Sequence, residues 1–181
     1  MLEGSAADVT IGVAVGIPQP HSTALQTWRR RVGDPAADVI WPHVTLLPPT
    51  AVPADELPAI EAHLAAVAAG ATPFSMHLAG TGTFRPTSPV VFVQISRGVS
   101  DCELLEKAIR SGSLRRELEF PYHPHVTVAH EISDRGLDEA FEGLSDFIAR
   151  FRVDRFGLFV RHADGSWSAR AEYPLGRAVS D

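Results

Sequence analysis

The chain reads Pro42-His43-Val44-Thr45-Leu46 in its first half and Pro124-His125-Val126-Thr127-Val128 in its second. Both copies of this motif lie in runs with strand character, and a proline precedes each histidine. Residues two apart in a strand point to the same face, so each copy projects its histidine and threonine together while its valine faces away. Valine is apolar and β-branched and suits a packed face. Each copy therefore presents one imidazole and one hydroxyl on one surface.

The two copies have similar surroundings. Their histidines are 82 positions apart, and each copy stands after one predicted helix and before another. Two lobes related by an approximate twofold axis would have this organisation. We therefore expect both imidazoles and both hydroxyls to meet around one point, in a cleft between the lobes.

Two imidazoles and two hydroxyls around one point suit the cleavage of a phosphodiester. Histidine titrates at about pH 6.5, so one ring can accept a proton from water while the other gives one to the leaving oxygen. Threonine hydroxyls can donate hydrogen bonds to the non-bridging oxygens as charge builds on them. We predict His43 and His125 as the acid–base pair in either order, Thr45 and Thr127 as phosphate-binding residues, and no need for a metal or another cofactor.

The rest of the chain mixes strand and helix patterns. Apolar alternation predicts strands at 8–15, 39–47, 74–78, 90–95, 125–132, 151–160 and 167–173. Helical patterns occupy 21–32, 53–69, 100–109 and 138–147. The pair Asp164-Gly165 predicts a hairpin between the last two strands. This order favours an α+β fold, with antiparallel sheets lining a central cleft and helices outside, over a doubly wound sheet.

Composition restricts the classes of partner. With 181 residues, 45% of them hydrophobic and 21% charged, residues 1–181 are expected to form a single globular domain with two lobes. The net charge of −6 disfavours long nucleic acid, whose affinity comes from a basic surface. The chain has one cysteine, and no signal peptide or membrane-spanning run is evident. We expect a cytoplasmic monomer that does not bind membranes.

The paired motifs closely resemble the signature of the 2H phosphoesterase superfamily, which includes the RNA 2′,3′-cyclic phosphodiesterases known as 2′-5′ RNA ligases. That signature is two copies of His-apolar-Ser/Thr-apolar, matched here at 43–46 and 125–128. The resemblance implies two lobes of antiparallel sheet around the active site, and the same acid–base and phosphate-binding roles. The first motif runs into Leu46-Leu47-Pro48-Pro49, where the RNA-processing branch of the family would have Phe-Leu-Gly. The substrate stays open: a nucleotide or RNA 2′,3′-cyclic phosphate, or a 2′-5′ linkage.

Three aromatic residues are candidates for substrate binding. Trp41 and Tyr122 lie two and three positions before a motif histidine. They could offer stacking platforms for a base, or they could pack at the edge of the cleft. By resemblance, Phe84 lies at the rim of the pocket.

Two alternatives from other classes remain open. A nucleotide-binding module could keep the cleft and have lost turnover. A zinc-dependent hydrolase could use His123, His125 and His130, because two histidines on one strand face can chelate zinc. The run Arg29-Arg30-Arg31 is most simply interpreted as the solvated face of a helix.

Overall fold

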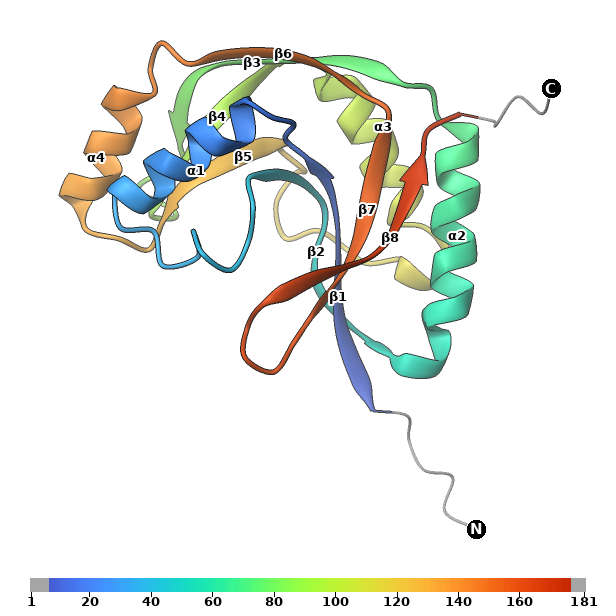
Figure 1. The fold of residues 1–181 in the computed structure, drawn as a ribbon. Helices are drawn as coiled ribbons and strands as arrows, with labels where there is room; N and C mark the ends of the chain where they lie inside the picture. The colour runs from blue at the N-terminus through green and yellow to red at the C-terminus, as the bar shows by residue number, and fades with distance from the viewer. Residues whose placement is uncertain (1–6, 177–181) are drawn as a thin grey trace.

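One curled antiparallel sheet organises the molecule (Figure 1). The structure is a computed structural model, and it describes residues 7–176. The strands are β1 (Asp8–Gly16), β2 (His43–Pro53), β3 (Phe74–Thr83), β4 (Val90–Arg97), β5 (His125–His130), β6 (Ile148–Val153), β7 (Arg155–Arg161) and β8 (Trp167–Pro174). The helices are α1 (His21–Arg31), α2 (Leu57–Gly70), α3 (Val99–Ile109) and α4 (Asp134–Gly143), with short 3₁₀ turns at Ala54–Glu56 and Gly112–Leu114.

The sheet has two matching halves. Its strand order is β6-β3-β4-β5-β2-β1-β7-β8, so four strands lie on each side of the line between β5 and β2. Helices α1 and α4 pack against β5 (Figure 1). Helix α2 packs against β8, and α3 packs against β2. The α+β class and the two-lobed arrangement are confirmed. The two lobes share one continuous sheet.

The two faces of the central strands carry different residues. In β1, Ile11, Val13 and Val15 are buried in the hydrophobic core. The residues between them, Gly12 and Ala14, line a cavity on the other face. Alternation of this kind fixes which face of the sheet packs, because a slip by one residue would expose the whole apolar set.

Several predicted boundaries were wrong. The single strand expected at 151–160 is two strands, β6 and β7, which lie in opposite halves of the sheet and are separated by Asp154. Strand β2 begins at His43, four residues later than expected, and continues through Pro48 and Pro49. Helix α4 begins at Asp134, four residues earlier than expected, because the Ser133 side chain accepts a hydrogen bond from the Gly136 amide and caps it.

Within residues 7–176, no helix combines the length and the apolar character needed to cross a bilayer.

Candidate functional site

The two motifs meet where the halves of the sheet join. Strands β2 and β5 pair antiparallel with Val44 opposite Val126; we call this line the seam. An antiparallel register through that pair sets His43 across from Thr127 and Thr45 across from His125. Both valines are fully buried on one face, and the histidines and threonines are half-buried on the other. The structure thus brings the four predicted residues together on one patch.

Both imidazoles are held in the same way. Nδ1 of His43 lies 2.7 Å from the backbone oxygen of Trp41, and Nδ1 of His125 lies 2.7 Å from that of His123. A carbonyl oxygen only accepts hydrogen bonds, so Nδ1 carries the proton in each neutral ring. Nε2 is then the free basic nitrogen of both rings. Each ring can therefore exchange a proton through Nε2 while its orientation is held through Nδ1.

Burial favours the neutral form of both rings. Loss of solvation lowers the pKa of His43, against the opposing effect of its bond to the Trp41 carbonyl, and the Arg29 cation lowers this pKa further. Burial also lowers the pKa of His125, where His123 and His43 add smaller repulsive contributions. Because each ring disfavours a proton on the other, a single added proton shared between the two sites is the easiest charged state to reach.

Phe84 lies against the second motif, as the resemblance implies. Its ring meets that of His125 edge-on at 5.0 Å between centroids and lies 4.5 Å from Phe92. Phe92, which the sequence did not single out, also contacts the His125 ring at 5.2 Å. A Cβ on Gly82 would come within 2.6 Å of the Phe92 ring, so the absence of a side chain there lets that ring pack against β3.

Trp41 stands at an apolar cavity of about 150 Å³. Its side chain is 61% exposed, so most of the indole surface is open to a ligand. His43 and Thr45 also line this cavity, and Phe159 and Trp167 contribute two more aromatic rings. Sequence reasoning did not assign these two residues to the site, because they lie more than 100 positions from the first motif and no local pattern marks them.

A second cavity of about 180 Å³ adjoins His43. It is more polar, and its lining includes Arg29, Asp34, Thr127 and His130. The pairing of β4 with β5 skips Val128, which forms a β-bulge. This bulge turns His130 to the same side as Thr127, whereas strict alternation from His125 would place it on the opposite face.

The three arginines expected on a solvated helix face are not equivalent. Arg30 and Arg31 are exposed and pair with Asp38 and Glu139. Arg29 is only 3% exposed and forms an ion pair with the buried Asp34. The interpretation as a solvated face was wrong for Arg29, because the helical period of α1 turns this residue inward.

Tyr122 occupies a different kind of position. Its hydroxyl donates a 2.8 Å hydrogen bond to the backbone oxygen of Thr45, and its ring packs against the hydrophobic core. Burial raises the pKa of this hydroxyl well above its ordinary value, so it stays a donor. Tyr122 therefore ties the segment before the second motif to the strand of the first. Its role as a stacking platform stays a prediction.

Within residues 7–176, no three His, Cys, Asp or Glu side chains converge closely enough to hold a metal ion. The three histidines of the zinc alternative, His123, His125 and His130, do not form such a group in this part of the chain.

Comparison with known proteins places the chain among phosphoesterases. A sequence profile of the 2′-5′ RNA ligase superfamily matches residues 17–165. The chain is 27% identical over 150 residues to a Bacillus cytotoxicus protein named as a phosphoesterase. The match covers 82% of this chain and 87% of that protein. E. coli LigT, in a crystal structure with 3′-AMP, aligns with a TM-score of 0.74 at 19% identity, over 94% of this chain and all of LigT. A crystal structure described as a phosphoesterase aligns with a TM-score of 0.70 at 22% identity, over 94% of this chain and all of that one.

Proposed function

Because this chain belongs to the 2′-5′ RNA ligase superfamily, a family of phosphoesterases, we propose that it hydrolyses a cyclic phosphodiester without a metal. The substrate class is a nucleotide or RNA end with a 2′,3′-cyclic phosphate, or a 2′-5′ linkage. One observation carries this proposal. His43 and His125 lie on one face at the seam, each with Nδ1 bonded to the carbonyl two residues before it and with no hydrogen-bond partner at Nε2 among residues 7–176.

The reaction needs two proton transfers. Nε2 of one neutral histidine takes a proton from water as the water oxygen attacks phosphorus. Nε2–H of the other histidine, protonated beforehand, gives its proton to the ribose oxygen as the P–O bond breaks. The products are a ribose hydroxyl and a phosphomonoester, and the proton has moved from one ring to the other. The same pair can run the reverse reaction, because the forward and reverse paths share one transition state.

The threonines have a separate role. Thr45 and Thr127 lie beside the opposite histidine across the seam, as the register requires. Their hydroxyls can donate to the two non-bridging phosphate oxygens, where negative charge grows in the transition state. A phosphodiester carries one negative charge, which matches a site where one proton on the histidine pair is the easiest charged state.

The two ends of the site suit a nucleotide. Trp41 and the apolar cavity lie beside His43, and Phe84 lies beside His125. An aromatic face binds bases of any sequence by stacking. Solved structures of E. coli LigT hold 3′-AMP and NADP⁺, ligands of nucleotide size. We propose small nucleotides or single RNA ends as substrates, since the net charge of −6 disfavours long nucleic acid.

The test is hydrolysis of 2′,3′-cyclic AMP, cyclic-phosphate-ended RNA and a 2′-5′ dinucleotide, followed by chromatography of the products. His43→Ala and His125→Ala should each lower the rate by about 10²–10⁴-fold, the usual contribution of a positioned acid or base. His77→Ala, a half-buried histidine on β3, is the matched control and should keep the wild-type rate. Near-wild-type cleavage by either folded site variant would contradict the proposal. Binding without cleavage by the wild type would favour the nucleotide-binding module.

A further inference from the structure

Three arginines on neighbouring strands share one exposed face of the sheet. Arg97 of β4 and Arg150 of β6 are both opposite the same residue of β3, His77. Arg152 lies two residues beyond Arg150 on the same strand. Residues opposite each other in an antiparallel pair project from the same face, and so do residues two apart in a strand. All three arginines are exposed, and we call them the arginine cluster.

This face of the sheet is the one that carries the second motif. Met76 and Leu78, which flank His77 on β3, are fully buried in the core. His77 and its cross-strand partners therefore project from the face opposite the core. Val126 lies in the same core, so its neighbour His125 also projects from the face opposite it. The arginine cluster and the motif histidines thus lie on one surface.

A β-bulge brings Arg97 onto this surface. Ile95 is buried and pairs with Leu78, and the next pair along β3 and β4 is His77 with Arg97. Ser96 is the extra residue of the bulge. Strict alternation from Ile95 would turn Arg97 towards the core.

The arginine cluster leads away from the second motif. Gln94 of β4 is directly opposite His125, and Arg97 follows on the same strand, roughly 10 Å farther at about 3.3 Å per residue. Arg150 is three strands from His125, roughly 15 Å at about 4.8 Å per strand. A single phosphate held at the motif histidines does not extend that far. Only a substrate that continues beyond the cleaved phosphate can contact the whole cluster.

The arginine cluster has no counter-ion among residues 7–176. Strands β3, β4 and β6 contain no aspartate and no glutamate. The ion pairs of this part of the chain involve other arginines. The three positive charges therefore face solvent without compensation.

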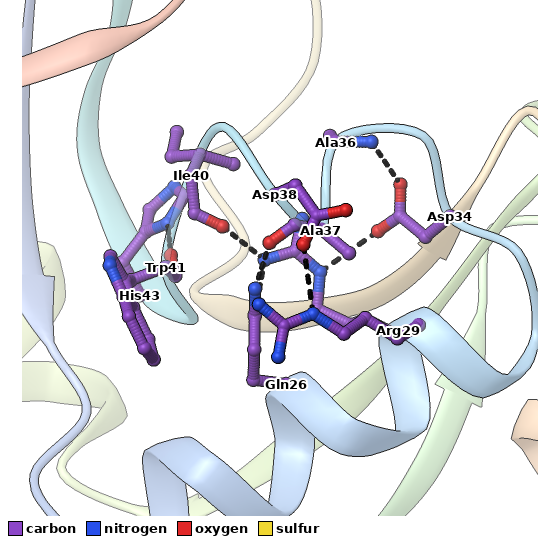
Figure 2. A network of polar contacts seen from close by, with 10 residues as sticks. Gln26, Arg29, Asp34, Ala36, Ala37, Asp38, Ile40, Trp41 and His43 are labelled. Atoms are coloured by element: carbon purple, nitrogen blue, oxygen red, sulfur yellow. Dashed lines mark hydrogen bonds and ion pairs between the residues drawn. The ribbon is translucent and has the colours of Figure 1, made fainter.

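The buried arginine beside the first motif is engaged differently (Figure 2). Arg29 donates from Nε to Asp34 at 2.9 Å and from Nη1 to the backbone oxygen of Ile40 at 2.5 Å. Its charge is balanced and these donors are used inside the protein. The arginine cluster, by contrast, keeps its charge and its donors available to a ligand.

Stability of the fold does not explain the arginine cluster. Positive charges gathered on one face of a sheet repel one another. Charged residues on an edge strand can prevent pairing with other chains, and β6 is an edge strand. Edge protection would account for Arg150 and Arg152. It does not account for Arg97, because β4 is paired on both sides, with β3 and β5.

We propose that the arginine cluster binds the phosphate backbone of a single-stranded RNA whose 3′ end lies at the motif histidines. Guanidinium groups recognise phosphates by paired hydrogen bonds, and the successive phosphates of a strand match cations spread over three β-strands. Backbone contacts carry no sequence information, so the binding is independent of base sequence. The preference for an RNA end over a free nucleotide as substrate rests on the proposed function, whereas the binding of the strand does not.

Binding is tested without turnover, by fluorescence anisotropy of a labelled single-stranded RNA of about ten nucleotides that ends in a 3′-phosphate. Each lost phosphate contact lowers the slope of log affinity against log salt by about 0.7, which is about fivefold in affinity at about 0.1 M salt. The triple variant with Arg97→Gln, Arg150→Gln and Arg152→Gln should therefore lower the slope by about 2. Unchanged affinity and slope in this folded variant would overturn the proposal.

Arg97→Gln alone separates RNA binding from edge protection. It should weaken binding by about fivefold at about 0.1 M salt. Arg135→Gln removes an exposed charge from α4, outside the arginine cluster, and is the matched control that should bind like the wild type. Wild-type affinity in Arg97→Gln, with aggregation of Arg150→Gln or Arg152→Gln, would assign the cluster to edge protection and contradict the proposal. If the triple variant does not fold, Arg97→Gln decides.

The consequence for the substrate is tested by kcat/KM for cyclic-phosphate-ended RNA relative to that for 2′,3′-cyclic AMP. The triple variant should lower this ratio by about a hundredfold, the product of about fivefold for each of the contacts. An unchanged ratio would overturn the preference for RNA ends. If the wild type cleaves neither substrate, the proposed function fails, while the anisotropy measurement still tests the binding of the strand.

Discussion

The hydroxyl of Tyr122 donates a 2.8 Å hydrogen bond to the backbone carbonyl of Thr45, across 77 positions of sequence. This bond joins the segment that precedes the second motif to the strand that carries the first. It lies next to the seam, where Val44 and Val126 are paired. The relative position of the two motifs therefore depends on this tyrosine as well as on strand pairing.

Tyr122→Phe should lower the free energy of unfolding by about 1 kcal/mol, because it removes a part-buried hydrogen bond to the Thr45 carbonyl. Urea unfolding followed by circular dichroism measures this loss. If Thr45 belongs to the active site as proposed, this bond also helps to position it, so kcat should fall as well. A variant with wild-type stability and wild-type kcat would show that the bond contributes nothing to the position of the motifs.

Thr45→Val and Thr127→Val should each reduce kcat by less than the histidine variants do, by about tenfold to a hundredfold. Valine keeps the branched shape and loses only the hydroxyl that donates to the phosphate as its charge grows. Steady-state kinetics on 2′,3′-cyclic AMP gives the comparison. Equal rates for the variants and the wild type would contradict the phosphate-binding role of the threonines.

Trp41→Ala should raise KM for 2′,3′-cyclic AMP by about fivefold or more, since stacking of one base is worth about 1–3 kcal/mol. The indole is largely exposed, so the thermal midpoint of unfolding should change little. Phe141→Ala, a partly exposed aromatic on α4, is the matched control and should leave KM unchanged. An unchanged KM in Trp41→Ala would place the base elsewhere.

Acid should destabilise the fold through the two motif histidines. Burial lowers the pKa of both His43 and His125 below the ordinary 6.5. The unfolded chain then binds more protons, so stability is full above about pH 6.5 and falls as the pH drops towards the folded-state values. The double variant with His43→Gln and His125→Gln should lose less stability between pH 7 and pH 5 than the wild type. Equal losses, measured by urea unfolding at each pH, would contradict this linkage.

Chelation should leave catalysis intact. After treatment with EDTA and removal of the chelator, hydrolysis of 2′,3′-cyclic AMP should proceed at the original rate, because the proposed steps use only imidazoles and hydroxyls. Loss of activity that zinc restores would instead support the zinc hydrolase built on His123, His125 and His130.

The local alternation of apolar and polar residues predicted most of the strands and which of their faces is buried. The spacing of histidine, valine and threonine assigns faces without knowledge of the partner strand, because the period of a strand is two residues. The burial of Val44 and Val126 follows this rule. Alternation cannot locate an interruption, and for that reason the break at Asp154 and the bulge at Val128 were not predictable.

The surroundings of the motifs depended on contacts that are distant in sequence. Trp167 lines the apolar cavity from the last strand and packs against Gly12, where a Cβ would be 3.3 Å from the indole. Arg29 belongs to a run of three arginines, and the charge of that run gives no sign of which member turns inward. Its burial depends on Asp34 and on the carbonyl of Ile40, which the turn after α1 brings back over the helix.

The seam has a mechanical consequence. The two halves of the sheet are joined through the pair Val44–Val126, and each half holds one imidazole. A small rocking of one half against the other would change the separation of the two imidazoles, because each half carries one of them. Hydrogen exchange should therefore show faster opening at the amides of residues 43–45 and 125–127 than in the middle of β1. A ligand that contacts both imidazoles links the two halves of the sheet. It should therefore slow hydrogen exchange at these amides before it slows exchange elsewhere.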